Sequence, residues 1–183
     1  EFIELYRGDK DLRLGKILCN KYNCDFVHLG TNISSPADSK IFGQKSYPVE
    51  RVGELPQNYH LLLMKSKLIF HRRGNISLGG FFRWTPGIEK ELLRWKPDLI
   101  VESPYLTLTP RSYSASFAAK RLGIPLVYID CGDIIPNLGL KHKLVLPFER
   151  RVVNRAAAVI TYNTSGKNRF VNKYGYPENK IHI

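Results

Sequence analysis

Apolar and polar positions alternate along the chain with two different periods, which predicts strands and helices in turn. Short apolar or β-branched runs next to Gly, Pro or Asp indicate strands, and longer stretches with apolar residues three or four positions apart indicate helices. The predicted strands are residues 2–6, 25–29, a short one near 47–52, 99–101, 124–129, 158–162 and 180–183. The predicted helices are residues 12–22, 59–72, 88–95, 111–122, 148–157 with Pro147 in the first turn, and one that opens near Asn163 or Thr164.

This order of elements predicts an α/β fold, Rossmann-like and doubly wound, with a mainly parallel sheet and helices on both faces. We expect residues 1–183 to form a single domain in which the first strand, helix and second strand make a right-handed β-α-β unit. Ligands of such sheets bind beyond the carboxyl ends of the strands. The loops expected to line a site are therefore residues 7–11, 30–35, 103–109, 130–136 and 163–166.

Composition narrows the functional classes. A hydrophobic fraction of 43% supports a folded core, which excludes a disordered chain. The chain has 28 Lys and Arg against 16 Asp and Glu, a net charge of +12, which favours anionic partners without choosing among nucleic acid, acidic lipid and phosphorylated substrates. Part of this charge is equally consistent with a solvated surface. The basic residues are spread over the chain, which argues against a nucleic-acid-binding stripe.

The cysteines and the apolar runs bear on location. Cys19, Cys24 and Cys131 fit neither a disulfide framework nor the paired spacing of a zinc site, so we expect no metal and a reduced, cytoplasmic setting. We expect no membrane-spanning segment, because the apolar runs are too short. Residues 65–84 mix cations with aromatics, which suits peripheral contact with an anionic membrane at its inner face. The alternative, a core helix with a solvated basic face, fits this pattern slightly better.

A series of motifs resembles glycosyltransferase family four in both order and spacing. The motifs are KPDLIV at 96–101, AAKRLGIPLV at 118–127, YIDCGDIIP at 128–136, RAAAVIT at 155–161 and YGYPENKIHI at 174–183. The resemblance implies the N-terminal, acceptor-side half of a GT-B fold in a retaining transferase of carbohydrate biosynthesis. It implies a nucleotide-sugar donor, a saccharide or lipid-linked acceptor and no further cofactor. It also implies that the donor-binding domain lies beyond this chain, and that residues 1–183 alone are inactive.

Two other readings stay open beside this one. The chain could be a non-enzymatic module that binds anions or nucleic acid, or another GT-B enzyme of sugar nucleotides, such as an epimerase. Salt-dependent binding to an oligonucleotide would favour the first, and catalytic carboxylates within or just beyond this chain would favour the second.

The resemblance and the expected loops supply the candidate site residues. Asp133 aligns with an acid of family members that read R-D-x-W-P, and is the candidate catalytic residue. The first loop has one glycine where the family has two, and Asn163 replaces the usual serine. The candidate substrate-binding residues are Gly8, Asp9, Ser103, Tyr105, Cys131, Gly132, Asn163 and Thr164. Six of these nine residues have a structural alternative: a turn for Gly8 and Ser103, a buried small side chain for Cys131, and helix caps for Asp133, Asn163 and Thr164.

Overall fold

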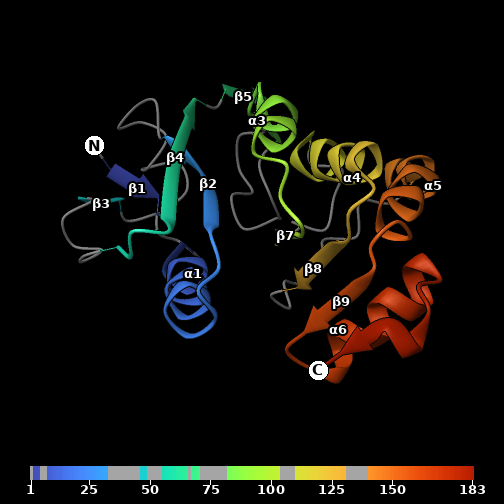
Figure 1. Ribbon diagram of the computed structural model, residues 1–183. Coiled ribbons are helices and arrows are strands. Elements are labelled where there is room, and N and C mark those ends of the chain that lie inside the picture. The colour runs from blue at the N-terminus through green and yellow to red at the C-terminus, as the bar shows by residue number, and fades with distance from the viewer. Residues whose placement is uncertain are drawn as a thin grey trace. The chain divides into compact units, whose positions relative to one another are not determined.

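A computed structural model describes residues 2–4, 8–32, 46–48, 55–65, 67–70, 82–103, 110–130 and 140–183. The chain divides into two compact units, Glu1–Lys67 and Leu68–Ile183 (Figure 1). The first contains β1 (Phe2–Glu4), α1 (Gly8–Tyr22), β2 (Phe26–Asn32), β3 (Ser46–Pro48) and β4 (Tyr59–Lys65). The second contains α3 (Ile88–Trp95), β7 (Ile100–Glu102), α4 (Pro110–Leu122), β8 (Leu126–Asp130), α5 (Leu140–Val153), β9 (Ala158–Thr161), α6 (Thr164–Arg169), a π-helix (Phe170–Tyr174), a 3₁₀ turn (Glu178–Lys180) and β10 (Ile181–His182). Two strands near the boundary, β5 (Lys67–Phe70) and β6 (Phe82–Trp84), pair with each other.

The sheet of the first unit has the strand order β3-β1-β2-β4. Its longest ladder joins β2 and β4 in parallel, from Phe26 opposite Tyr59 to Asn32 opposite Lys65. The strand β1 runs antiparallel to both β2 and β3. The expected parallel β-α-β unit at the start of the chain is therefore wrong. Alternation shows which residues form a strand, but the direction of a short strand depends on its partners, and β1 is paired along its whole length with β3.

Helix α1 packs on this sheet through Gly15. A Cβ at this position would lie 2.4 Å from Cε2 of Tyr59 and 2.6 Å from Cδ1 of Phe26, so a larger side chain would push α1 away from the strands. Leu12 and Cys19 lie one turn before and after Gly15 and are buried with Tyr59. The small core of this unit therefore depends on a close contact between a helix backbone and two aromatic rings.

The helix predicted at residues 59–72 is also wrong, since this segment forms β4 and then β5. The leucines at 61–63 are good helix formers, but an apolar run this short fits a buried strand equally well. Seven consecutive pairs with β2 satisfy the backbone of β4, and this pairing overrides local propensity.

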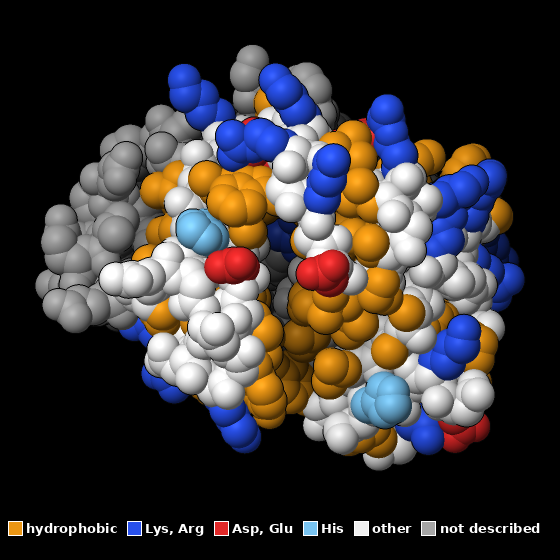
Figure 2. All heavy atoms as spheres, viewed as in Figure 1, with side chains coloured by type: hydrophobic (Ala, Val, Ile, Leu, Met, Phe, Trp, Pro, Cys, Tyr) orange, Lys and Arg blue, Asp and Glu red, His pale blue; other side chains and the backbone are white. Residues whose placement is uncertain are grey.

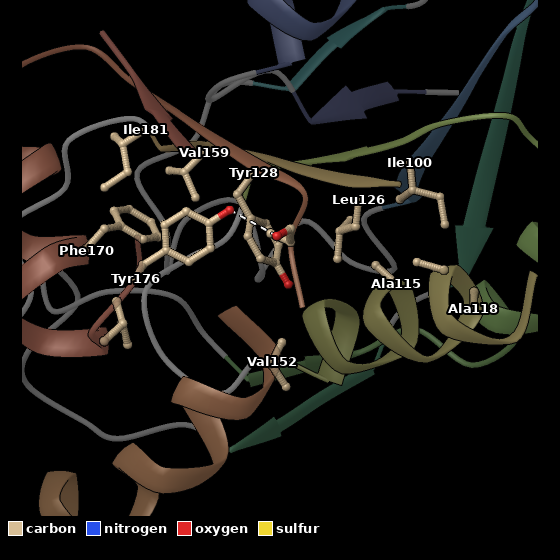
Figure 3. Packing of buried hydrophobic residues seen from close by; sticks show 13 residues of the cluster. Ile100, Ala115, Ala118, Leu126, Tyr128, Val152, Val159, Phe170, Tyr176 and Ile181 are labelled. Atoms are coloured by element: carbon tan, nitrogen blue, oxygen red, sulfur yellow. Dashed lines mark hydrogen bonds between the residues drawn. The ribbon is translucent and has the colours of Figure 1, made fainter. Parts of the chain in front are cut away.

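The sheet of the second unit has the order β10-β9-β8-β7, and all of its neighbouring strands are parallel. Side chains on one face alternate with the pleat and enter the core, as the burial of Leu126, Tyr128 and Asp130 along β8 shows. Figure 3 shows this face packed against the helices, with the Tyr176 hydroxyl donating to the carbonyl of Ala156 at 3.0 Å. The buried cluster comprises Ile100, Ala115, Ala118, Ala119, Leu126, Tyr128, Val152, Ala156, Val159, Phe170, Tyr174, Tyr176 and Ile181.

The helices of this unit follow the predictions with one exception. The predicted helix at 88–95 coincides with α3, the one at 111–122 lies within α4, and α6 opens at Thr164 as expected. The exception is α5, which spans Leu140–Val153 with Pro147 inside it instead of starting after that proline. Proline removes one helical hydrogen bond, but Glu149 and Val152 beyond it are buried and keep the helix against the core.

The observed fold class is thus α/β with parallel sheets and alternating helices, as the pattern predicts. That residues 1–183 form one domain stays a prediction. Lysine and arginine side chains are scattered over the face in Figure 2, with apolar side chains between them. Within the ranges described above, no helix is both long and apolar enough to cross a membrane.

Candidate functional site

Three polar side chains end three neighbouring strands of the second unit. Glu102, Asp130 and Thr161 are the last residues of β7, β8 and β9, and all three are buried, Asp130 at 1% exposure and Glu102 at 7%. Because the strands are parallel, these residues lie at the same edge of the sheet, with Asp130 directly opposite Thr161. Polar groups therefore gather at the carboxyl edge, where α/β folds bind their ligands.

Glu102 is held by the first turn of α4. Its Oε1 accepts hydrogen bonds from Ser112 Oγ at 2.8 Å and from Arg111 Nε at 3.1 Å. The same guanidinium donates from Nη2 to the carbonyl of Ser103 at 2.7 Å. Arg111 therefore fixes both the buried carboxylate and the backbone where the chain leaves β7. We call the ion pair between Glu102 and Arg111 the Glu102 pair.

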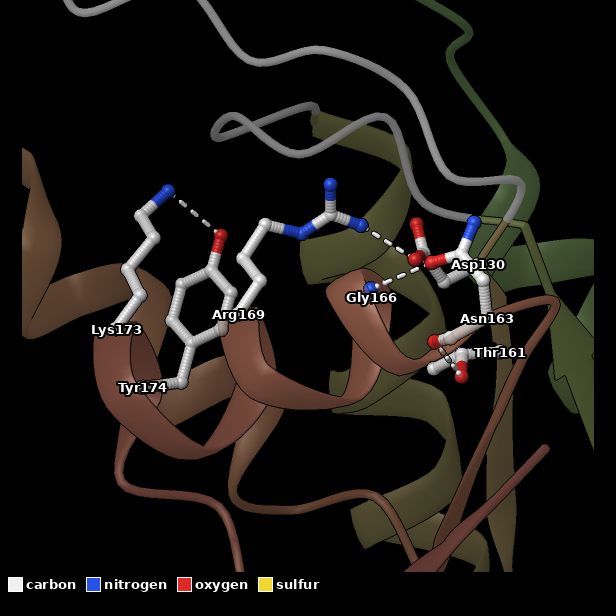
Figure 4. Close-up of polar contacts among 7 residues, drawn as sticks. All are labelled: Asp130, Thr161, Asn163, Gly166, Arg169, Lys173 and Tyr174. Carbon is white, nitrogen blue, oxygen red and sulfur yellow. Dashed lines mark hydrogen bonds and ion pairs between the residues drawn. The ribbon is translucent and has the colours of Figure 1, made fainter.

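Asp130 is held by α6 in a second ion pair, the Asp130 pair. Arg169 Nη2 contacts Asp130 Oδ2 directly, and the guanidinium is itself largely buried (Figure 4). Buried charges are stable in proteins when they are paired and hydrogen-bonded, and removal of one partner leaves the other uncompensated. The Asp130 pair thus ties the end of β8 to a helix that follows β9.

Gly166 allows this close approach of α6 to the sheet. A Cβ on Gly166 would lie 2.9 Å from Asp130 Oδ2 and 3.1 Å from Thr161 Cβ. Its backbone N–H donates to Asn163 Oδ1 at 2.8 Å, so Asn163 is the N-cap of α6. The Thr161 hydroxyl donates to the carbonyl of Asn163 at 3.0 Å and fixes the turn between strand and helix.

A third ion pair lies one turn farther along the chain, on the π-helix that follows α6. Lys173 Nζ lies 3.1 Å from Glu149 Oε2 on α5 and donates to the Tyr174 hydroxyl at 2.7 Å. Burial lowers the pKa of Lys173, and the Glu149 carboxylate partly offsets this effect. Burial also raises the pKa of Tyr174. Arg169 and Lys173 thus join β8 and α5 to one helical segment, which makes the support of the carboxyl edge rigid.

The ion pairs of this site hold neighbouring parts of the chain in position. Both carboxylates at the edge are matched by a guanidinium, so they fix the ends of β7 and β8 in place. Within the described ranges, no group of three or more His, Cys, Asp or Glu side chains could hold a metal ion.

The predicted site residues have different outcomes. Ser103 lies at the carboxyl edge with its carbonyl bound by Arg111, and Asn163 and Thr164 begin α6 at the same edge. Gly8 and Asp9 begin α1 in the first unit, so the predicted loop at 7–11 is wrong from residue 8 onward. Tyr105, Cys131, Gly132 and Asp133 lie outside the described residues. A role in substrate binding or catalysis stays a prediction for all of these residues.

Sequence reasoning missed the two buried pairs. Asp130 lies on the same strand face as Leu126 and Tyr128, and Glu102 lies on the same face as Ile100. The alternation in the sequence therefore already indicated a buried acid at the end of each strand. Arg169 could not be found in this way, because the fold alone brings it to Asp130 across 39 positions.

A comparison with protein families decides the class of this chain. The model of Glycosyltransferase Family 4 matches residues 50–183, which include the whole carboxyl edge described above. The chain belongs to Glycosyltransferase Family 4. It is thus a transferase domain of a family that binds nucleotide-sugar donors and acceptors. The match starts beyond Gly8 and Asp9, so it gives no support to a family role for these two residues. No curated protein matches the chain.

Proposed function

We propose that residues 1–183 are the acceptor-side domain of a retaining glycosyltransferase. The enzyme moves a sugar from a nucleotide-sugar donor to a saccharide or lipid-linked acceptor. The donor is bound mainly by a further domain outside residues 1–183. The observation that carries this proposal is the carboxyl edge of the second unit, where two buried ion pairs hold the ends of β7 and β8.

The chemistry explains why such an edge suits an acceptor. Sugar transfer passes through a state with positive charge on the sugar and a departing nucleotide diphosphate. The acceptor hydroxyl must be held against the anomeric carbon, and an error of about 1 Å costs about 100-fold in rate. Segments that start from immobile backbone can hold a hydroxyl with this accuracy. The Glu102 and Asp130 pairs supply such starting points at Ser103 and at Asp130, the last residue of β8.

Asp133 is the proposed contact of the acceptor hydroxyl. It lies three positions after Asp130 in the sequence, beyond the end of β8 that the Asp130 pair holds. A carboxylate accepts a hydrogen bond from a hydroxyl and orients its lone pair toward the sugar. Ser103, Tyr105, Cys131 and Gly132 are proposed to line the acceptor site, with Asn163 and Thr164 at its border.

The proposal is tested on the full-length protein with a panel of nucleotide sugars and of saccharide and lipid-linked acceptors. We expect turnover, and a product whose anomeric configuration by NMR equals that of the donor sugar. Residues 1–183 expressed alone should give no turnover. Inversion at the anomeric carbon, or full turnover by residues 1–183, would contradict the proposal.

A pair of matched variants tests Asp133. Asp133→Asn should lower kcat/KM for the acceptor about 100-fold while the KM of the donor stays unchanged, since it disturbs acceptor orientation. The control is Asp98→Asn, an exposed acid that precedes β7 at the opposite edge of the sheet. Equal losses in the two variants would remove the assigned role from Asp133.

A further inference from the structure

Helices α4 and α5 of the second unit expose apolar side chains that the core does not use. Leu144 is 71% exposed, Phe148 on the next turn of α5 is 62% exposed, and Phe117 on α4 is 52% exposed. Single exposed apolar residues are common in proteins, but several on adjoining helices mark a surface that contacts a partner.

These residues form one surface that includes cations. Leu144, Phe148 and Arg151 lie three or four positions apart on α5 and share one exposed face, beside the face that buries Glu149 and Val152. Just beyond α5, the Arg155 guanidinium lies 5.4 Å from the centroid of the Phe117 ring, which joins the two helices. Figure 2 shows cationic and apolar side chains interleaved where Figure 1 places α4 and α5. The α4–α5 surface is defined by Phe117, Lys120, Lys143, Leu144, Phe148 and Arg151.

The charges of this surface have one sign. Helix α4 contains no acidic residue, and the one acid of α5, Glu149, is 5% exposed and paired with Lys173 on the core side. Lys120, Lys143 and Arg151 are exposed. The complementary partner is therefore anionic, and it must also accept aliphatic and aromatic side chains.

We propose that the α4–α5 surface binds an anionic lipid bilayer. Phe148, Leu144 and Phe117 enter the boundary between headgroups and acyl chains, and the cations contact the headgroup phosphates. A nucleic acid fits less well, because contact of Leu144 with a sugar–phosphate backbone stabilises nothing. Transfer of its side chain from water to acyl chains lowers the free energy. A second copy of the chain would bring like charges together. The inference goes beyond sugar transfer, since lipid binding needs no donor.

This surface differs from the segment that the sequence suggested. Residues 65–84 were the segment considered for membrane contact, and the helix expected at 59–72 covers its first part. Lys67–Phe70 and Phe82–Trp84 instead pair as strands, and residues 71–81 lie outside the described part. The α4–α5 surface likewise combines cations with apolar side chains, and here both are exposed on helices.

Co-sedimentation of the intact protein with vesicles tests the proposal. One vesicle preparation contains phosphatidylcholine alone, and the other contains phosphatidylcholine and phosphatidylglycerol in equal amounts. We expect binding to the anionic vesicles that weakens as salt is added, and little binding to the neutral ones. The double variant Leu144→Ser/Phe148→Ser should weaken binding at least about tenfold, and Arg151→Glu at least about fivefold.

Two matched controls separate the surface from general effects. Lys90→Glu changes the net charge as Arg151→Glu does, but at an exposed site on α3, and Ile17→Ser removes an exposed apolar side chain of α1. Both should bind vesicles as the parent does, and all variants should keep the far-ultraviolet circular dichroism of the parent.

Several results would overturn the proposal. They are an absence of binding to anionic vesicles, equal binding to both vesicle types, or equal losses in the surface and control variants. A dimer in sedimentation velocity that Phe148→Ser dissociates would assign the surface to a second copy instead. Transfer to a water-soluble acceptor should be unchanged in the surface variants, so failure of lipid binding and failure of the proposed transferase function are distinguishable.

Discussion

The two units of the chain are built from the same kinds of element but differ in how strand direction is decided. In the four-stranded sheet of the second unit, each pair of strands that follow one another along the chain is separated by a helix, and all four strands are parallel. In the first unit, β1 is antiparallel to its neighbours although a helix lies between β1 and β2. A strand–helix–strand order therefore predicts a parallel pair reliably when the strands share a large buried face, and less so when one strand is short.

The two units also differ in their buried cores, and the second unit has the larger one. The second unit has a cluster that includes Phe170 and Val159 at 0% exposure, whereas the described cluster of the first unit consists of Leu12, Cys19 and Tyr59 with a few partly buried neighbours. A larger buried apolar area gives a larger stabilisation and fixes the register of the strands more firmly. The predictions below test this difference.

The largest effect is expected at Phe170. Phe170→Ala should lower the free energy of unfolding by about 4 kcal/mol, because it leaves a cavity at a fully buried site of the second unit. The measurement is urea unfolding followed by circular dichroism. Phe148→Ala is the matched control at an exposed position and should change stability by less than about 0.5 kcal/mol. Similar losses in the two variants would mean that the core is not centred on Phe170.

The next effect is expected at the Asp130 pair. Asp130→Asn should cost about 3 kcal/mol, because the buried Arg169 guanidinium loses its ionised partner. The exposed Asp98→Asn should cost less than about 0.5 kcal/mol in the same unfolding experiment. A double variant, Asp130→Asn with Arg169→Gln, should recover part of the loss. No recovery would show that the two side chains are not coupled.

A smaller effect is expected in the first unit. Gly15→Ala should cost about 2 kcal/mol, because the added methyl group overlaps the rings of Tyr59 and Phe26. Hydrogen exchange should show faster exchange of amides in α1, β2 and β4. Ile17→Ala, an exposed substitution on the same helix, is the control. A neutral outcome for Gly15→Ala would contradict the close packing of α1 on this sheet.

The smallest effect is expected from pH: the free energy of unfolding should fall at high pH. Burial raises the pKa of Tyr128 and Tyr174 above the usual value near 10, so the unfolded chain gives up these protons first. The contribution of these two tyrosines to stability is fully present below about pH 10 and then falls with a limiting slope of about 1.4 kcal/mol per pH unit for each tyrosine. The lowered pKa of Lys173 acts in the opposite sense, since below about pH 10.5 the unfolded chain holds that proton more tightly and stability rises with pH.

Urea unfolding of the parent and of Tyr174→Phe between neutral pH and about pH 11 measures this slope. The variant should lose stability less steeply above about pH 10, because one of the two buried phenols is gone. Identical slopes in the two proteins would exclude Tyr174 as a source of the effect.

Much of the second unit was predictable from local pattern. Leu126, Tyr128 and Asp130 alternate on one face, and the sequence following Pro97 places strands and helices close to their observed bounds. The extent of α5 was missed because Pro147 reads as a helix start, whereas the buried residues beyond it keep the helix continuous. Residues 59–65 were misread because pairing with β2 lies outside the local window.

The strand ends that form the candidate site were predictable from the sequence, but the cations that hold them in place were not. The carboxyl ends of β7, β8 and β9 and the cap at Asn163 follow from the strand pattern and from known capping preferences. Arg169 and Lys173 look like ordinary surface cations of a basic chain. Their roles depend on Asp130 and Glu149, which the tertiary fold brings to the same helical segment.

The central claim is that the acceptor is bound at the carboxyl edge of the second unit. Hydrogen exchange of the full-length protein, with and without saturating acceptor, tests it most directly. We predict slower exchange in residues 103–109 and 131–136 when the acceptor is bound, and unchanged exchange in residues 96–99 at the opposite edge. Slower exchange in residues 96–99 with no change at the carboxyl edge would contradict the account.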